Sequence, residues 1–366
     1  MTTDVASGVW QYSLDLAQGL RAYDTKTTLC VLGPAPSAEQ RAATRRIPGL
    51  ELVNLDVPLE FSADTPEDVL QAASKVARAA GEHDPTIVHL NSPALIAAGN
   101  YPAPVVAVCH SCIASWWQAV RPGCPLANEH GWHKQLTAEG LRKADAVVAP
   151  SRAFAGTISQ IYALSRAPAV IYNGRRPSVR ANLHKERMPQ GAFGFTSGTI
   201  WDAGKNIGAL DAAAAQMDVP VFAADNAGTP PLPVQNLKAL GRLSEAEIAD
   251  WLSAKPIFIS TAVYEPFGLA ALEAAEAACP LVLSDIPTFR ELWDGVARFV
   301  SPFDEMAISS VVNELARDAQ TRVLLGAAAR RRARRYTAEV MAAKTQGIYS
   351  MLVAGRSTRA SRAPAL

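Results

Sequence analysis

The sequence predicts an α/β protein of two domains, each a parallel sheet with helices on both faces. Short β-branched apolar runs alternate with amphipathic helical patterns almost from end to end, which is typical of repeated β–α units. The 366 residues are about twice the usual domain length. A single stretch rich in proline and charge, Arg175–Gly191, interrupts the alternation near the middle of the chain. We place the interdomain linker there.

The expected elements follow in order. Strand candidates of the first half are Leu29–Leu32, Glu51–Leu55, Ile87–Leu90, Val105–Cys109, Ala146–Ala149 and Ala169–Tyr172. Those of the second half are Phe193–Thr196, Val221–Ala224, Ile257–Ser260, Leu281–Ser284 and Arg298–Val300. Helical patterns between them include Val9–Leu20, Asp68–Ala79, Leu136–Ala144, Asn206–Ala215 and Leu269–Ala278. Only Met1–Asp4 precede the first glycine, so we expect the first strand either to be missing or to begin upstream.

These elements give an N-terminal domain at residues 1–174 and a C-terminal domain at residues 190–336. A last helical pattern, Thr337–Val353, follows the second sheet. We expect this returning helix, residues 337–354, to pack on the N-terminal domain. The basic, Ser/Ala-rich segment 355–366 is expected to be disordered. No period of 20–50 residues repeats, which excludes solenoids and propellers.

Composition narrows the class of protein. Hydrophobic residues make up 49% and charged residues 19%, enough apolar material for two cores. The net charge of +1 gives no general attraction to nucleic acid, so we expect no nucleic-acid partner. The five cysteines lack a framework spacing, and we find neither a secretory signal nor an apolar run of about 18 residues. We therefore expect a cytoplasmic protein with reduced thiols.

The strongest local signal is the run from Tyr264 to Glu273. Pro266 suits the first turn of a helix, where its missing N–H costs nothing. Phe267, Gly268 and Leu269 then offer backbone N–H groups at the positive end of the helix dipole, which is an anion site. Glu265 and Glu273 flank these amides, and carboxylates accept hydrogen bonds from sugar hydroxyls. An anion cradle between two carboxylates matches a nucleotide-sugar, whereas two isolated glutamates would more simply be solvated.

Glu265-Pro266-Phe267-Gly268 with Glu273 resembles the E-x7-E signature of retaining GT-B glycosyltransferases, family 4 in particular. Four shorter pieces, each weak alone, agree with that family in order and spacing. They are Gly8-Val9-Trp10, similar to its N-terminal glycine loop; His110-Ser111, similar to its active-site histidine turn; Gly204-Lys205-Asn206, similar to its phosphate-binding lysine loop; and Ser284-Asp285-Ile286-Pro287, which resembles the segment after the signature helix. The resemblance implies two Rossmann-like domains facing a cleft.

The resemblance also implies roles for these residues. Glu273 would bind the ribose hydroxyls and Glu265 the donor sugar. Lys205 would neutralise the departing diphosphate, and the amides of Phe267, Gly268 and Leu269 would bind the same phosphates or the sugar. Gly8 would let the N-terminal loop approach the phosphates, and His110 would lie over the sugar. The family needs no metal and no cofactor besides its nucleotide-sugar substrate, and this chain has no Asp-x-Asp motif.

Three residues depart from the family pattern. Thr199 stands where an Arg usually also contacts the diphosphate, a loss worth about 1.5–3 kcal/mol. Arg175 or Arg176 could replace it, or both could be solvated linker charges. Ser7 stands where a second glycine is common, which requires a negative φ. Ala278 likewise replaces a frequent glycine.

Two further clusters have ordinary explanations beside functional ones. Cys109, His110, Cys112, Cys124, His130 and His133 are zinc-ligand types, but the His130–His133 spacing is one residue short and Cys109 continues an apolar strand. Arg330–Arg335 is a basic helix end, either solvated or attracted to an anionic membrane. Trp116-Trp117 could face a lipid-linked acceptor, be buried, or stack on a sugar.

We therefore predict a retaining, metal-independent hexosyltransferase that uses a UDP- or GDP-sugar and a sugar or lipid-linked sugar acceptor. Its place would be the cytoplasm, with weak contact at the inner membrane face as an alternative. A second candidate is a GT-B relative that binds a nucleotide-sugar but turns it over poorly, because of Thr199 and the expected loss of the first strand. A dinucleotide oxidoreductase is disfavoured, since no G-x-G-x-x-G follows a strand.

Overall fold

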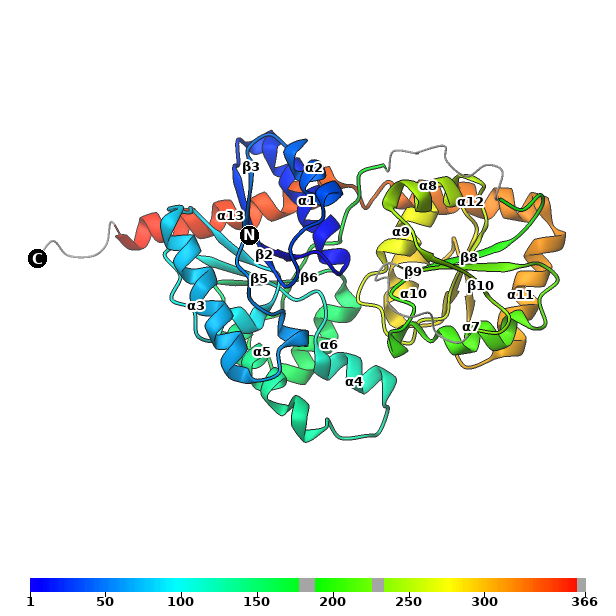
Figure 1. The fold of residues 1–366 in the computed structure, drawn as a ribbon, viewed down its shortest axis with the longest axis horizontal. Coiled ribbons are helices and arrows are strands. Elements are labelled where there is room, and N and C mark those ends of the chain that lie inside the picture. Colours follow the sequence, from blue (N-terminus) through cyan, green and yellow to red (C-terminus); the bar gives the residue numbers. More distant parts are fainter. Residues whose placement is uncertain (178–187, 226–233, 361–366) are drawn as a thin grey trace, which may run out of the picture. The chain divides into compact units, whose positions relative to one another are not determined.

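The computed structural model describes residues 1–177, 188–225 and 234–360, and it divides into two compact units (Figure 1). Unit 1 comprises Met1–Gly174 and Ala338–Leu366, and unit 2 comprises Arg175–Thr337. Most of the predicted linker, residues 178–187, lies outside the described residues.

Unit 1 contains two groups of parallel strands. The first has the order β1-β2-β3, with β1 at Thr2–Asp4, β2 at Thr27–Leu32 and β3 at Leu50–Asn54. The second has the order β4-β5-β6-β7, at Val88–Leu90, Val105–Val108, Ala146–Ala149 and Ala169–Val170. The expectation that the first strand is missing is wrong, because Thr2–Asp4 pairs in parallel with Cys30–Leu32. Its Thr-Thr-Asp sequence carries no apolar signal, although all three residues are buried.

The helices of unit 1 cover both faces of these strands. They are α1 (Gly8–Leu20), α2 (Ala38–Arg45), α3 (Pro66–Glu82), α4 (Ile113–Val120), α5 (Gly131–Lys143), α6 (Arg152–Tyr162) and α13 (Ala338–Ala360). Short 3-10 turns lie at η1 (Arg21–Tyr23), η2 (Glu60–Ser62), η3 (Pro93–Ile96) and η4 (Asn128–His130).

The C-terminal helix α13 lies along α1 in Figure 1, red beside blue. Leu16 and Leu20 of α1 share one apolar cluster with Met341 and Tyr349 of α13. The two backbones come close at Gly19, where a Cβ would lie 2.6 Å from the Cβ of Ala342. α13 continues to Ala360, so residues 355–360 are helical and the expectation of disorder is wrong for them. Residues 361–366 lie outside the described part of the chain.

Unit 2 contains one six-stranded parallel sheet of order β10-β9-β8-β11-β12-β13. Its strands are β8 (Gly194–Gly198), β9 (Val221–Asp225), β10 (Lys238–Arg242), β11 (Ile257–Ser260), β12 (Leu281–Ser284) and β13 (Arg298–Val300). Its helices are the 3-10 turn η6 (Ala203–Lys205), α7 (Ile207–Ala214), α8 (Glu245–Ser253), α9 (Leu269–Glu276), α10 (Pro287–Trp293), α11 (Glu305–Arg317) and α12 (Ala319–Ala333). The sequence analysis missed β10, whose residues are mostly exposed at the sheet edge and lack an apolar run.

The chain enters and leaves unit 2 at one place. The backbone N–H of Arg175 donates to the carbonyl oxygen of Tyr336 over 3.1 Å, and Arg175 forms a parallel bridge with Thr337. The first and last residues of the unit therefore lie side by side.

The backbone conformation of Ala278, just after α9, leads us to expect that a glycine there stabilises unit 2. Ala278 has φ +62°, in the left-handed region that costs an alanine about 1–2 kcal/mol. Because glycine avoids this strain but loses more entropy on folding, Ala278→Gly should raise the free energy of unfolding of unit 2 by about 0.5–1 kcal/mol. The matched control is Ala277→Gly, at a neighbouring residue with φ −76°, which should not stabilise. Chemical denaturation measures both, and equal effects of the two substitutions would contradict the assignment of strain.

Candidate active site

The candidate site of unit 2 lies where its strand order reverses. β8 has β9 on one side and β11 on the other, so the connections after β8 and β11 run in opposite directions. Ligands of open parallel sheets bind beyond the carboxyl ends of the strands at such a point. The segment after β8 carries Lys205, and the segment after β11 carries Glu265. The topology thus brings together two residues that are 60 positions apart in the sequence.

Lys205 and Glu265 form an ion pair with 2.5 Å between Nζ and Oε2. Their side chains are 27% and 16% exposed, so the pair is largely screened from water but still reachable. Burial by itself lowers the pKa of Lys205, but attraction and hydrogen bonding by Glu265, together with Asp202, outweigh it, so the pKa lies above its ordinary value. Lys205 is therefore a cation at neutral pH.

Backbone hydrogen bonds hold the two loops together. The carbonyl oxygen of Gly204 accepts from the N–H groups of Val263 (2.9 Å) and Tyr264 (3.2 Å). Asn206 is left-handed at φ 53°, and its amide donates to the carbonyl oxygens of Thr261 and Pro302. Asparagine tolerates this conformation better than most residues, and here it orders the segment after Lys205.

Helix α9 begins at Leu269 with Gly268 as its N-cap, so Pro266 precedes the first helical turn and its predicted helical position is wrong. Gly268 has φ +93°, and a Cβ there would lie 2.8 Å from the ring of Phe289. The position therefore requires glycine. The ring of Phe267 is 3% exposed and meets Tyr336 edge-on at 5.9 Å, which leaves its backbone as the part available to a ligand. The amides of Gly268 and Leu269 lie at the positive end of α9.

Glu273 accepts from Arg175, with 2.7 Å between Oε1 and a guanidinium nitrogen. Arg175 is 2% exposed and Glu273 21%. Of the two alternatives left open for Arg175, a solvated linker charge is wrong, because its guanidinium is buried against the signature helix. Sequence reasoning did not pair these residues, since they lie 98 positions apart in the sequence.

Thr199 lies in the loop between β8 and η6. Its carbonyl oxygen accepts from the N–H of Asp202, and the Asp202 carboxylate accepts from the N–H of Gly204 over 2.8 Å. The position that lacks the usual Arg thus belongs to the ordered turn leading into Lys205.

In unit 1, Asn91 follows β4 and links it to β1 of the other strand group. Its backbone N–H donates to the hydroxyl of Thr2 (2.9 Å), and its side-chain amide donates to the carbonyl oxygen of Thr2 (2.6 Å). Sequence analysis missed Asn91; its place directly after a strand was the available signal.

A glycine loop follows β1. The Asp4 carboxylate accepts from the N–H groups of Ala6 and Ser7 and from the Ser7 hydroxyl. Burial raises the pKa of Asp4 despite these hydrogen bonds. Ser7 has φ −123°, the negative value that its substitution for glycine requires, and it caps α1 through Val9 N–H. Gly8 is the first residue of α1.

His110, after β5, belongs to a polar network with defined tautomers. Because the Asn91 amide nitrogen donates to Thr2, its Oδ1 is the acceptor for Nε2–H of His110 (2.9 Å) and of His89 (3.2 Å). His89 Nδ1 then accepts from the Tyr349 hydroxyl of α13 (2.6 Å). This leaves Nδ1 of His110 as an acceptor, with Tyr12 packed edge-on at 4.4 Å.

Burial lowers the pKa of His110 to about 3 and, as the largest of several causes, that of His89 to about 3. Both imidazoles are therefore neutral at physiological pH. His110 presents a hydrogen-bonding group there and carries no positive charge.

The comparisons with known proteins agree on the family. The model of Glycosyltransferase Family 4 matches residues 6–178, and that of Glycosyl transferases group 1 matches residues 233–332. Between them the matches leave out only residues 1–5, 179–232 and 333–366. The chain belongs to the GT-B glycosyltransferases.

Solved structures share the fold at low identity. Sucrose-phosphate synthase of Thermosynechococcus elongatus has 16% identity and a TM-score of 0.76, over 94% of this chain and 93% of the other. Anabaena HepE in complex with UDP-glucose has 17% identity and a TM-score of 0.72, over 96% of this chain and 98% of the other. WaaG, a glycosyltransferase involved in lipopolysaccharide biosynthesis, has 13% identity and a TM-score of 0.71, over 95% of this chain and 97% of the other. No curated protein matches this glycosyltransferase in sequence.

The cysteines and histidines considered as zinc ligands make other contacts in this glycosyltransferase. Cys109 and Cys112 are buried, and the Sγ of Cys112 lies 3.0 Å from the hydroxyl oxygen of Ser115. His133 stacks on Trp132 at 3.5 Å and faces Glu60 at 3.8 Å. Within the described ranges, no group of three or more His, Cys, Asp or Glu residues could hold a metal ion.

One arginine at the basic end of α12 forms hydrogen bonds within unit 2. Arg332 donates to the carbonyl oxygens of Leu292 and Asp294 at the end of α10, whereas Arg330, Arg331, Arg334 and Arg335 are exposed. Trp116 and Trp117 are half-buried, with ring centroids 6.4 Å apart. The helices of the described residues include none long and apolar enough to cross a bilayer.

Because His89 and His110 are neutral when folded, we expect the free energy of unfolding of unit 1 to fall in acid. Between pH 6.5 and 5 an unfolded histidine binds protons that His89 and His110 do not bind when folded, so stability is present above pH 6.5 and is lost as the pH falls. Each histidine contributes a slope of up to about 1.4 kcal/mol per pH unit. Urea denaturation at pH 7 and pH 5 measures the loss.

His110→Gln keeps an N–H donor for Asn91 but removes one titrating group, so it should reduce the loss by about half. His83→Gln, at a surface position, is the matched control and should not reduce it. An equal loss in wild type and His110→Gln would show that His110 is not held neutral.

Proposed function

We propose that this glycosyltransferase moves a hexosyl group from a UDP- or GDP-sugar to a sugar or lipid-linked sugar acceptor, with retention of configuration and without a metal ion. The observation that carries the proposal is the Lys205–Glu265 ion pair at the strand reversal of unit 2, beside the first amides of α9. A cation and oriented amides are the groups that stabilise a departing diphosphate. We assign binding of the nucleotide-sugar donor to unit 2 and binding of the acceptor to unit 1.

The proposed chemistry follows from the charge of each group. The glycosidic bond to the diphosphate breaks as the acceptor hydroxyl bonds to the anomeric carbon from the same face. A phosphate oxygen accepts the hydroxyl proton. Lys205, kept cationic by Glu265, stabilises the charge that develops on the phosphate. His110, neutral and with Nδ1 as an acceptor, is assigned a hydrogen bond to a hydroxyl of the donor sugar.

Glu265 is proposed to contact the donor sugar and Glu273 the ribose. The Arg175 contact orients Glu273 through one oxygen, and the proposal assigns the other carboxylate oxygen to the ribose hydroxyls. UDP-glucose, the ligand of the Anabaena HepE structure, is a suitable first donor to test. Synthesis of a glycan or exopolysaccharide is the proposed setting, with weak contact to the inner membrane face through the exposed arginines of α12.

Ligand-induced stabilisation tests the donor assignment. At about 100 times its dissociation constant, the true nucleotide-sugar should raise Tm by about 5–10 °C. The panel is UDP, GDP and ADP with their common sugars, and NAD as the probe for an oxidoreductase. A shift given by NAD and by no sugar nucleotide would reject the proposal.

Glu273→Gln should remove most of the shift produced by the best donor. Glutamine keeps a polar partner for the buried Arg175, whereas alanine would leave that charge unpaired and destabilise unit 2. Glu276→Gln, on the same helix, is the matched control and should keep the shift. A full shift in Glu273→Gln would contradict the ribose assignment.

Thr199 favours the second candidate, a relative that binds donor but turns it over poorly. Thr199→Arg should raise turnover about 10- to 100-fold if the missing contact limits the reaction, because a charged hydrogen bond is worth about 1.5–3 kcal/mol. Thr199→Gln controls for side-chain length. The turnover of each form is measured as steady-state release of UDP or GDP in the presence of acceptor sugars. No turnover in any form, with a donor that clearly binds, would leave only the binding protein.

A further inference from the structure

Two cysteines flank His110 in the turn that leads from β5 to α4. Cys109 directly follows β5, and Cys112 is the N-cap of α4. Both residues are buried, at 0% and 8% exposure, and no disulfide joins them. In Cys-x-x-Cys pairs and at helix starts, a thiol loses its proton more easily than an ordinary cysteine does. The proposed glycosyl transfer uses neither sulfur.

The two sulfurs contact each other. The Cys109 thiol and the Cys112 sulfur form a side-chain hydrogen bond. The Cys112 sulfur also lies 3.0 Å from the hydroxyl oxygen of Ser115, and the Cys109 sulfur lies 3.5 Å from the carbonyl oxygen of Ser111. A disulfide forms without a large backbone movement only between side chains that already point at one another. The contact of the two thiols meets this condition.

The hydroxyl of Tyr162, at the end of α6, faces the same sulfur. It is one of the buried polar side-chain atoms of the described residues that lack a partner at ordinary hydrogen-bond distance, and its electrostatic interaction is with Cys112. Burial, as the largest cause, raises the pKa of Tyr162, so the hydroxyl keeps its proton. A thiolate at Cys112 is the acceptor toward which this proton can be directed.

The neighbours of the pair give the two sulfurs different charges. The hydrogen bond from Cys109 is the largest cause that lowers the pKa of Cys112, and it outweighs the opposite effect of burial. The same hydrogen bond and burial raise the pKa of Cys109, which therefore keeps its proton. One thiolate and one thiol are thus in contact, as in pairs where one cysteine is oxidised and the other resolves it.

We propose that Cys109 and Cys112 are a site of reversible oxidation: hydrogen peroxide converts them into a disulfide across His110, and this bridge lowers glycosyl transfer until a dithiol reduces it. The effect on turnover rests on the proposed function, whereas the formation of the bridge does not.

The chemistry needs only peroxide and the two sulfurs. The Cys112 thiolate attacks one peroxide oxygen, the O–O bond breaks, and the departing hydroxide takes a proton and becomes water. Cys112 is then a sulfenic acid. The Cys109 sulfur attacks the Cys112 sulfur, the S–O bond breaks, and the oxygen leaves as water with the Cys109 proton. The two sulfurs lose two electrons in total, and peroxide gains them.

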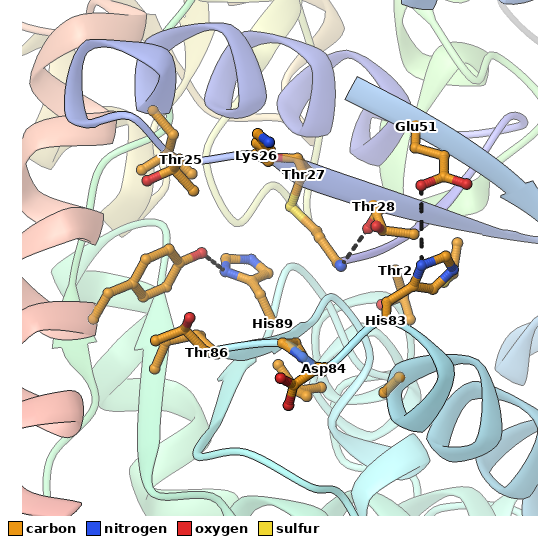
Figure 2. A pocket seen from close by; sticks show the side chains of 18 of the residues that line it. Thr2, Thr25, Lys26, Thr27, Thr28, Glu51, His83, Asp84, Thr86 and His89 are labelled. Carbon is orange, nitrogen blue, oxygen red and sulfur yellow. Dashed lines mark hydrogen bonds and ion pairs between the residues drawn. The ribbon is translucent and has the colours of Figure 1, made fainter. Parts of the chain in front are cut away.

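Closing the bridge moves the turn that carries His110. The sulfurs of a disulfide are about 2.0 Å apart, much closer than hydrogen-bonded thiols, so Cys112 must shift toward Cys109. The His110 imidazole is held through its Nε2–H to Asn91 over 2.9 Å. His89 shares that asparagine and also accepts from the Tyr349 hydroxyl, a bond that Figure 2 shows beside the cavity of unit 1. Oxidation should therefore weaken the bond of His110 and leave that of His89.

Peroxide treatment of the full chain tests the site. The background is Cys124→Ser, because Cys124 is exposed and would react by itself. Peptide mass mapping should find Cys109 and Cys112 joined, with the pair lighter by two hydrogen atoms, and dithiothreitol should reverse this. Turnover with UDP-glucose and an acceptor sugar should fall about tenfold, the effect of one lost hydrogen bond in the site, and should recover after reduction.

Cys109→Ser in the same background is the matched variant. It keeps Cys112 but has no resolving thiol, so peroxide should leave a sulfenic acid that reacts with dimedone, and no bridge. A background protein in which Cys112 stays reduced under peroxide that oxidises Cys124 of the wild type, or passes to sulfinic acid without a bridge, would overturn the site. This result requires no buried substitution and no turnover.

A second measurement separates this proposal from the proposed function. The NMR signal of the His110 Nε2 proton, assigned with His110→Gln, should shift or exchange faster with water on oxidation, whereas the signal of His89 should not. If the reduced protein transfers no sugar, the proposed function fails, and this signal still reports on His110. A bridge that leaves the His110 signal unchanged would overturn its effect on the site.

Discussion

The ion pair between Lys205 and Glu265 is the contact on which the candidate site of unit 2 depends. Neither charge is fully solvated, so each requires the other, since an unpaired charge at such depth costs several kcal/mol. The pair fixes the segment after β8 against the segment after β11 at the point where the strand order reverses. The left-handed Asn206 and Gly268 follow Lys205 and Glu265, where the chain turns into α7 and α9. An incoming diphosphate meets a cation that is already oriented.

In unit 1 the network around Asn91 consists of uncharged side chains. They are an asparagine after β4, two neutral histidines and a tyrosine, and the asparagine hydrogen-bonds to β1. Asn91 determines the state of the network, because its amide nitrogen donates to Thr2 and Ser13, and its oxygen therefore accepts from both imidazoles. The two units therefore present different chemistry: a charged pair in unit 2 and oriented neutral dipoles in unit 1.

Hydrophobic periodicity was sufficient to predict most of the sheets, because a parallel strand buried on both faces is a short apolar run. It failed where the strand is polar or exposed: β1 is Thr-Thr-Asp and β10 lies at an edge. The family resemblance anticipated the neighbourhood of Lys205 and Glu265. It did not anticipate Arg175 against Glu273 or Asn91 against His110, since contacts between residues 98 and 19 positions apart depend on tertiary structure that local patterns do not contain. The start of α9 was misplaced because Pro266 is compatible with both a helix start and the turn before it.

The junction at Arg175 has a mechanical consequence. Unit 2 is attached to the rest of the chain at two covalent points, and these are hydrogen-bonded to each other through Arg175, Tyr336 and Thr337. The same arginine holds Glu273 on α9, and Tyr336 packs on Phe267 just before that helix. Helix α9, which is assigned to the nucleotide, therefore contacts the residues at which the chain enters and leaves unit 2. A displacement of α9 would move the backbone at these residues.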